Sequence, residues 1–266
     1  GTLLMAFLAN YPFALAPGMG LNAYFAYTVV LGMGYSWEFA LTAVFAEGII
    51  FILLSLTNVR EAIFNAIPKN LKSAVSVGIG LFIAFVGLQN AKIVIGGSTL
   101  VQLFSVEKYN ELNGVNASFN DVGITVALAL VGILITGILV IKIVKGNILW
   151  GILITWILGI ICQFAGIYIP NPELGFYNLL PDFSNGLSIP SLSPILFKLD
   201  FHGIVSADFV VILFAFLFVD LFDTIGTLVG VSSKAGMLDE NGKLPRIKGA
   251  LLADAIATTA GAALGT

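Results

Sequence analysis

Composition and charge define the environment in which this chain can fold. The sequence has 266 residues, of which 58% are hydrophobic and only 10% are charged, with a formal net charge of −3. Soluble domains carry roughly 25% charged residues, so this composition excludes a water-soluble globular surface. The apolar residues occur in stretches of about 17 to 25 residues, the length that crosses a hydrocarbon core about 30 Å thick. The sequence therefore predicts an all-α polytopic membrane protein.

The apolar stretches predict about seven to eight membrane spans. One of them is a shorter, broken segment at about 17–34. The chain starts and stops inside apolar runs, so we expect it to be a fragment of a longer protein. The continuous spans are expected at about 1–16, 36–57, 75–93, 121–144, 147–167, 208–231 and 249–266.

Prolines and glycines interrupt the first apolar region. Pro12, Pro17, Gly18 and Gly20 all occur at membrane depth, so this region cannot form one continuous helix. Irregular backbone is tolerated in the hydrocarbon layer only where protein buries it or where it lines a cavity. We therefore expect the segment from Pro17 to Asn22 to line a cavity. A simple Pro-Gly turn near one membrane interface is the alternative.

Basic residues occur in alternate loops and predict the orientation. Nine of the twelve fall in three loops, and the loops between them, near 92–120 and 168–207, are turns that carry only three. By the positive-inside rule the first set is cytoplasmic. The segment 59–74, which begins near Arg60, suits a short helix on the cytoplasmic interface, and a solvated linker also fits. The nine residues are Arg60, Lys69, Lys72, Lys142, Lys145, Lys234, Lys243, Arg246 and Lys248.

Two carboxylates lie inside one predicted span. Asp220 and Asp223 are three residues apart, so they share one helical face, which Thr224 and Thr227 extend. An ionised carboxylate at the bilayer centre costs at least about 2.5–3.5 kcal/mol and must face a cavity or a partner. Two such groups this close are not expected both to be ionised at neutral pH. The pair predicts a proton-binding site, unless it merely caps helix ends or bonds neighbouring backbone.

Two further acidic residues lie within or near predicted spans. Glu47 lies in the middle of a span and could line a pathway or form an interhelical hydrogen bond, and we favour the second interpretation. Asp254 lies six residues beyond Lys248, near the cytoplasmic start of the last span. It could be an ordinary interfacial charge or part of a site, and both interpretations stay open.

Several function classes lack the residues that they require. The chain has one histidine, His202, one cysteine, Cys162, no phosphate-binding loop and no basic-aromatic patch, so we expect no metal, no cofactor, no catalytic residues and no nucleic-acid partner. An intramembrane aspartyl protease needs two buried aspartates and is a remote alternative. Those enzymes carry them on two helices, usually with a Gly-x-Gly-Asp run, whereas Asp220 and Asp223 share one helix without such a run.

Two segments are specific enough to indicate a family. Ala9–Phe25, with its Pro-Phe-Ala-Leu-Ala-Pro-Gly-Met-Gly-Leu-Asn run, and Val219–Leu228, with Asp-Leu-Phe-Asp-Thr-Ile-Gly-Thr, resemble the guanine-hypoxanthine permeases of the AzgA-like branch of the nucleobase-cation symporters, in the xanthine/uracil permease superfamily. Gly87–Ala91 and Ala253–Thr258 extend the resemblance along the chain. It implies a fold of fourteen spans in two inverted halves, divided into core and gate domains, of which this chain is a piece.

The resemblance also implies a domain organisation. Core-domain helices are expected over 1–58, including the broken helix at about 17–34, and again over 208–266, where the second repeat starts. Between them the expected parts are a cytoplasmic interfacial segment at 59–74, gate-domain helices at 75–167 and an outward loop at 168–207. The second broken helix of the family would begin where this chain ends, so half of the site is expected to be missing.

The site residues follow from the same resemblance. It implies that Gly20 and Asn22 form the substrate-facing end of the broken helix, and that Asp220 and Asp223, with Thr224, hold a purine and couple protons. A 6-oxopurine presents N–H donors and ring-nitrogen and carbonyl acceptors, which a carboxylate paired with an amide can satisfy.

These features together predict a multi-pass transporter of the cytoplasmic membrane. The expected substrates are guanine and hypoxanthine, with adenine a further candidate, carried by H⁺ symport, with Na⁺ as the alternative ion. A transporter of the same fold for xanthine, uracil or another small solute is the runner-up. Membrane lipid is an expected partner, and a homodimer is a possible assembly.

Overall fold

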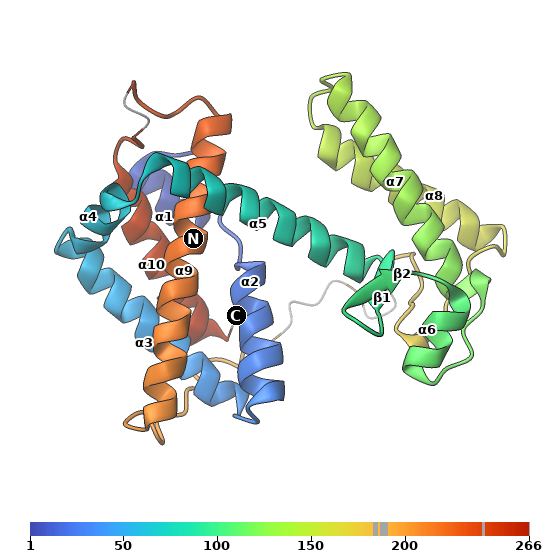
Figure 1. Cartoon of the computed structure of the whole chain (residues 1–266), viewed down its shortest axis with the longest axis horizontal. Helices are drawn as coiled ribbons and strands as arrows, with labels where there is room; N and C mark the ends of the chain where they lie inside the picture. The colour runs from blue at the N-terminus through green and yellow to red at the C-terminus, as the bar shows by residue number, and fades with distance from the viewer. Residues whose placement is uncertain (183–185, 187–190, 241–242, 266) are drawn as a thin grey trace. The chain divides into compact units, whose positions relative to one another are not determined.

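The computed structural model describes residues 1–182, 186, 191–240 and 243–265, and part of the expected loop at 168–207 lies outside these ranges. The chain divides into two compact units, which Figure 1 draws and which are described separately. The first comprises Gly1–Phe82 and Ile189–Thr266, and the second comprises Ile83–Ser188. Helix α5 (Lys69–Asn90) begins in the first unit and ends in the second.

The first unit consists of helices from both ends of the sequence. The short helices α1 (Thr2–Leu4) and η1 (Met5–Ala9) precede an irregular segment, and α2 (Met19–Ala23) continues directly into η2 (Tyr24–Gly32), where η1 and η2 are π-helical. The remaining helices of this unit, besides the start of α5, are α3 (Trp37–Leu56), α4 (Val59–Ala66), α9 (Ala207–Lys234) and α10 (Ile247–Leu264).

The second unit contains a helical hairpin and a small sheet. Helices α7 (Ile124–Ile141) and α8 (Asn147–Phe164) pack closely, because a Cβ atom added to Gly151 would lie only 2.1 Å from Oγ1 of Thr136. The expected loop near 92–120 is more than turns, since it holds an antiparallel pair of strands and a short helix. The smaller elements are β1 (Val94–Gly96), β2 (Val101–Leu103), α6 (Val106–Asn113), η3 (Phe119–Gly123) and η4 (Pro172–Leu174).

Six helical segments in the described part of the chain are long and apolar enough to cross a membrane. This confirms the polytopic all-helical fold class, although the two short strands are an addition to it. Each of the six overlaps one of the expected continuous spans. The segments are Trp37–Leu56, Asn70–Asn90, Phe119–Ile141, Asn147–Phe164, Ala207–Lys234 and Ile247–Leu264.

The expected span at 1–16 is wrong in its second half. The helix ends at Ala9 because Asn10 adopts the left-handed conformation, with φ of 56°. The backbone from Asn10 to Gly18 is then irregular until α2 begins at Met19. The predicted interruption by prolines and glycines is therefore confirmed, and it lies between two short helices. The Tyr11 hydroxyl donates a hydrogen bond to the Pro245 carbonyl, which fixes the start of the irregular segment next to α10.

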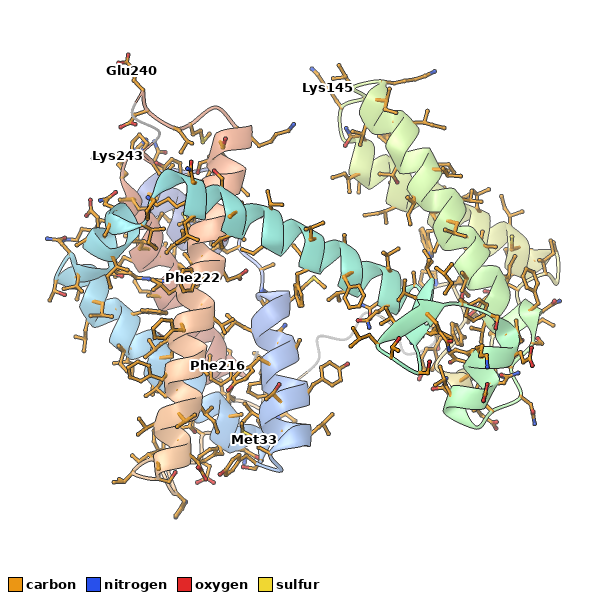
Figure 2. The ribbon with its side chains drawn as sticks, in the orientation of Figure 1. Met33, Lys145, Phe216, Phe222, Glu240 and Lys243 are labelled. Carbon is orange, nitrogen blue, oxygen red and sulfur yellow. The ribbon has the colours of Figure 1, made fainter. Side chains whose placement is uncertain are left out.

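Two apolar clusters hold the first unit together. One joins η1, α9 and α10 through Met5, Ile225 and Leu251. The other joins η2, α3 and α9 around Phe216, labelled in Figure 2, whose ring meets that of Tyr24 edge to face at 5.0 Å between centroids. Both clusters involve α9, so this helix has neighbours on two sides.

Small residues bring the helices of the first unit into close contact. A Cβ atom on Gly48 of α3 would lie 2.3 Å from Oγ1 of Thr259 on α10, and one on Gly226 of α9 would lie 2.4 Å from Cδ1 of Ile79 on α5. Backbones approach this closely in membranes where small residues form the interface. Gly226 therefore allows α9 and α5 to pack closely.

Candidate functional site

An arginine is buried at the centre of the first unit. Asn58 takes a left-handed conformation after α3, and the chain turns there into α4, whose second residue is Arg60. None of the Arg60 surface is exposed. Helix α4 thus forms where an interfacial helix was expected, but the Arg60 side chain turns inward, so it is not one of the exposed cytoplasmic cations.

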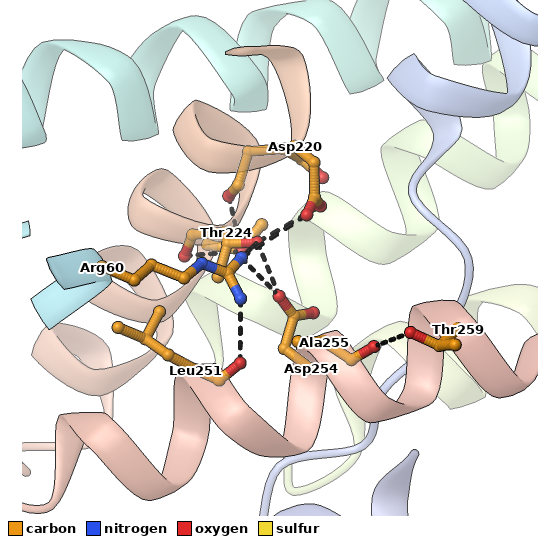
Figure 3. Close-up of polar contacts among 9 residues, drawn as sticks. Arg60, Asp220, Thr224, Leu251, Asp254, Ala255 and Thr259 are labelled. Atoms are coloured by element: carbon orange, nitrogen blue, oxygen red, sulfur yellow. Dashed lines mark hydrogen bonds and ion pairs between the residues drawn. The ribbon is translucent and has the colours of Figure 1, made fainter. Parts of the chain in front are cut away.

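Helices α9 and α10 supply the acceptors for the Arg60 guanidinium (Figure 3). Nη1 donates to the Leu251 carbonyl at 2.8 Å, and Nη2 donates to Oδ2 of Asp254 at 2.9 Å. Nη2 also lies 3.4 Å from Oδ2 of Asp220. The guanidinium carbon is 4.0 Å from the ring centroid of Phe51 on α3, a cation–π contact. Residues from three helices, α3, α9 and α10, therefore converge on one buried cation from α4.

Thr224 belongs to this cluster as well. Its Oγ1 atom lies 3.0 Å from Oδ2 of Asp254, 3.4 Å from Oδ1 of Asp220 and 3.4 Å from Nη2 of Arg60. Asp220 is 4% exposed and Thr224 is 6% exposed, so both are shielded from solvent within the unit. The interpretation of Asp254 as an ordinary interfacial charge is wrong, because its carboxylate forms the shorter of the two Arg60 ion pairs.

Asp223 has different neighbours from Asp220, although the two residues are one turn apart on α9. A Cβ atom on Gly18 would lie 2.9 Å from Oδ2 of Asp223, so this carboxylate lies against the irregular segment just before α2. Asp223 is partly exposed, whereas Asp220 is buried at the ion pairs. Asp220 and Asp223, which were expected to share one polar face of α9, therefore lie in different surroundings.

Gly20 and Asn22 both lie in the first turns of α2, next to the segment that Asp223 contacts. Gly20 is half-buried, and a Cβ atom there would lie 3.8 Å from Cε1 of Phe82. Asn22 is exposed, and its backbone N–H donates to the Gly18 carbonyl at 3.0 Å. The structure thus brings Gly18, Gly20, Asn22 and Asp223 into one region at the break.

Glu47 belongs to the buried cluster, a placement that the sequence alone did not predict. It lies on α3, its surface is fully buried, and Asp220 on α9 is among the charged groups that act on it. The available signal in the sequence was an acidic residue in the middle of an apolar span. The favoured expectation of an interhelical hydrogen bond is not borne out, because neither carboxyl oxygen of Glu47 has a hydrogen-bond partner in the described part of the chain.

A polar hollow lies elsewhere in the first unit, between α5 and α9. Its volume is about 390 Å³, and none of the expected site residues contributes to it. The residues that line it are Ser73, Ser76, Val229, Gly230, Ser233 and Lys234.

Six candidate spans in the described part of the chain, with a broken helix and a buried ion cluster, define a multi-pass membrane protein. The sequence matches the Permease family (Xan_ur_permease) over residues 1–266, and the chain belongs to this family. The resemblance seen at the break and on α9 is thereby confirmed. Permeases are transporters and not enzymes, and the chain is a multi-pass protein of the plasma membrane.

Similar proteins occur in archaea and bacteria. The chain is 46% identical over 266 residues to the putative permease MJ0326 of Methanocaldococcus jannaschii. It is 43% identical over 269 residues to the guanine/hypoxanthine permease PbuG of Bacillus subtilis and 34% identical over 269 residues to the adenine permease AdeP of Escherichia coli. Each match covers 100% of this chain but only 53–54% of the relative. The chain thus spans about half the length of these relatives.

The ion cluster predicts a large stability loss when Arg60 is replaced. In Arg60→Leu, Asp220 and Asp254 keep their places without a counter-charge, and breaking a buried ion pair in this way costs about 3–5 kcal/mol. We expect the free energy of unfolding in detergent to fall by about this amount. Lys145→Gln removes an exposed cation from the turn after α7 (Figure 2) and is the matched control, with no expected change. Equal stability of Arg60→Leu and the wild type would contradict the cluster.

Proposed function

We propose that the protein to which this chain belongs transports purine nucleobases across the plasma membrane by H⁺ symport. The substrates are guanine and hypoxanthine, with adenine as a further candidate. Family membership supports a transporter, and the names of the B. subtilis and E. coli relatives support purines as the substrate class. The substrate and the coupling ion of the whole protein belong to this proposal.

The site that carries the proposal is the region where Asp223 meets the break before α2. The observation behind it is the 2.9 Å approach of Oδ2 of Asp223 to the Cβ position of Gly18, which brings a carboxylate from α9 to the start of α2. Broken helices in transporters place such irregular backbone at substrate sites. In this proposal the Asp223 carboxylate accepts a purine N–H, and the exposed Asn22 amide, which can donate and accept, satisfies the remaining edge.

The other expected residues take supporting roles in this proposal. Gly20, without a side chain, lets the substrate approach the α2 backbone. Thr224, the next residue after Asp223, and Asp220, about one turn before it on α9, act on the Asp223 region from the buried cluster. The coupling proton binds at the Asp223 and Asp220 carboxylates, and Na⁺ is the alternative ion. Lipid contacts and a homodimer belong to the proposal as well.

The domain organisation also stays a proposal. We assign residues 1–58 and 208–266 to a core domain and 75–167 to a gate domain. The division of the chain into units at Phe82 and Ile189 supports a discontinuous core that combines both ends of the sequence. Residues 59–74 then form the interfacial segment, of which α4 is a part, and 168–207 form an outward loop.

Gly18→Ala tests the substrate site without a backbone penalty. Gly18 has φ of −69° and ψ of 123°, which alanine adopts freely, so the added methyl group acts by contact. Its tightest contact is with Oδ2 of Asp223 at 2.9 Å, whereas Leu21 lies at an ordinary 3.5 Å. We expect the carboxylate to be displaced and purine affinity in the full-length protein to fall by about 1–3 kcal/mol. Gly80→Ala is the matched control, because nothing lies within 4 Å of that Cβ position. Unchanged competition by every purine in Gly18→Ala would place the substrate elsewhere.

The variant Asp223→Asn tests whether Asp223 couples purine transport to the proton gradient. The amide keeps the shape and much of the hydrogen-bonding capacity of the carboxylate but cannot titrate, so purine binding should survive in part while accumulation driven by a pH gradient is lost. Exchange of internal for external purine should persist in reconstituted vesicles, because exchange need not return an empty, deprotonated site. Glu107→Gln on α6 is the control for removal of a carboxylate. Wild-type accumulation in Asp223→Asn would rule out this residue as the proton carrier.

A competition experiment distinguishes the proposed guanine and hypoxanthine transporter from a transporter for xanthine or uracil. Unlabelled guanine, hypoxanthine, adenine, xanthine and uracil should be compared as competitors of radiolabelled hypoxanthine uptake by the full-length protein. The same fold serving xanthine or uracil is the alternative. Stronger competition by xanthine or uracil than by guanine would favour that alternative.

A further inference from the structure

Glu47 lies in surroundings that do not suit an ionised carboxylate. Its residue surface is fully buried on α3, and neither carboxyl oxygen receives a hydrogen bond from a donor in the described part of the chain. An isolated ionised carboxylate is very costly to bury in an apolar interior, and such a group neutralises instead. By contrast, Asp220 and Asp254 both receive hydrogen bonds from Arg60.

The neighbour of Glu47 is another carboxyl group. Asp220 on α9 is among the charged groups that act on Glu47. Two ionised carboxylates repel each other and neither can donate a hydrogen bond, so a proton on one of them relieves the conflict. Asp220 already accepts a hydrogen bond from the Arg60 guanidinium, which favours its ionised form. The proton of the pair therefore belongs on Glu47.

The charges around Glu47 lead to the same assignment. The groups that face it are Asp220 from α9, Arg60 from α4 and Asp254 from α10, so one cation meets three carboxyl groups. A single bound proton reduces the excess negative charge from two to one. Nowhere in the described ranges do His, Cys, Asp and Glu side chains form a group of three that could hold a metal ion. A proton is the ligand that this geometry accepts.

We infer that Glu47 is a proton-binding residue, whose fully buried carboxylic acid forms a proton site separate from Asp223. Its participation in transport rests on the proposed H⁺ symport. The bound proton itself does not depend on any substrate. Helix α9 connects the two sites, because Asp220 belongs to one and Asp223 to the other.

Infrared spectroscopy of the purified full-length protein tests this site directly. At neutral pH, without purine, the wild type should show the carbonyl stretch of a protonated carboxylic acid, with the shift that deuterium exchange produces. Glu47→Gln should lose this band, because its amide keeps the size and polarity of the side chain but holds no acidic proton. Glu47→Asp should keep an acid band. Glu38→Gln is the control, the same substitution at a less buried position of the same helix, and should keep the wild-type band.

Three outcomes would overturn the inference. One is a wild-type spectrum without the acid band at neutral pH, a result that needs no variant to fold. Another is an unchanged band in Glu47→Gln. The third is loss of the band in Asp223→Asn with its retention in Glu47→Gln, which would place the proton at the other carboxylate. A protein that shows the Glu47 band but takes up no purine would refute the proposed function and leave this inference standing.

Discussion

The first unit depends on the buried positive charge of Arg60. A guanidinium without exposed surface has lost its water and must find acceptors and counter-charge inside the protein. It finds them on α9 and α10, and its flat face rests on Phe51 of α3. One side chain of the short helix α4 therefore fixes the mutual positions of three membrane helices. The close packing of Gly48 against Thr259 brings α3 and α10 together independently.

Helix α9 links this ion cluster to the break near Gly18. Asp220 and Thr224 project into the cluster, while Asp223 lies against the irregular segment before α2. Asp220 and Asp223 are about one helical turn apart, so a change in the charge of one alters the electrostatic potential at the other. This arrangement gives the proposed transporter a direct physical link between proton binding in the interior and the carboxylate offered to a purine.

The sequence predicts the spans well and the internal polar contacts poorly. In the described part of the chain, six helices long and apolar enough to cross a membrane lie where the apolar stretches predict them, since the bilayer sets the length of a span. The break was predictable because two prolines and two glycines exclude a continuous helix there. The end of the first helix at Ala9 was not, because the irregular residues after it are as apolar as a helix would be.

The polar cluster combines residues that no local pattern connects. Arg60 and Asp254 are 194 positions apart, and an inward-turning arginine has the same sequence signature as an interfacial one. Glu47 was visible as an acid in mid-span, but its neighbour Asp220 becomes apparent only when α3 and α9 are packed together. For Asp220 and Asp223, helical spacing predicted one shared face. Asp220 lies in the ion cluster, whereas Asp223 lies against the irregular segment before α2. The neighbouring segments, and not the helical spacing, determine this difference.

A double-mutant cycle between Arg60 and Asp254 tests the central role of the ion cluster most directly. Unfolding free energies in detergent would be measured for the wild type, Arg60→Leu, Asp254→Leu and the double variant. Residues that share one buried network show interaction energies of about 0.5–3 kcal/mol, and we expect a value near the upper end of that range. The double variant should then be less destabilised than the sum of the single variants. Additive losses would show that the two side chains do not depend on one another, and would contradict the account.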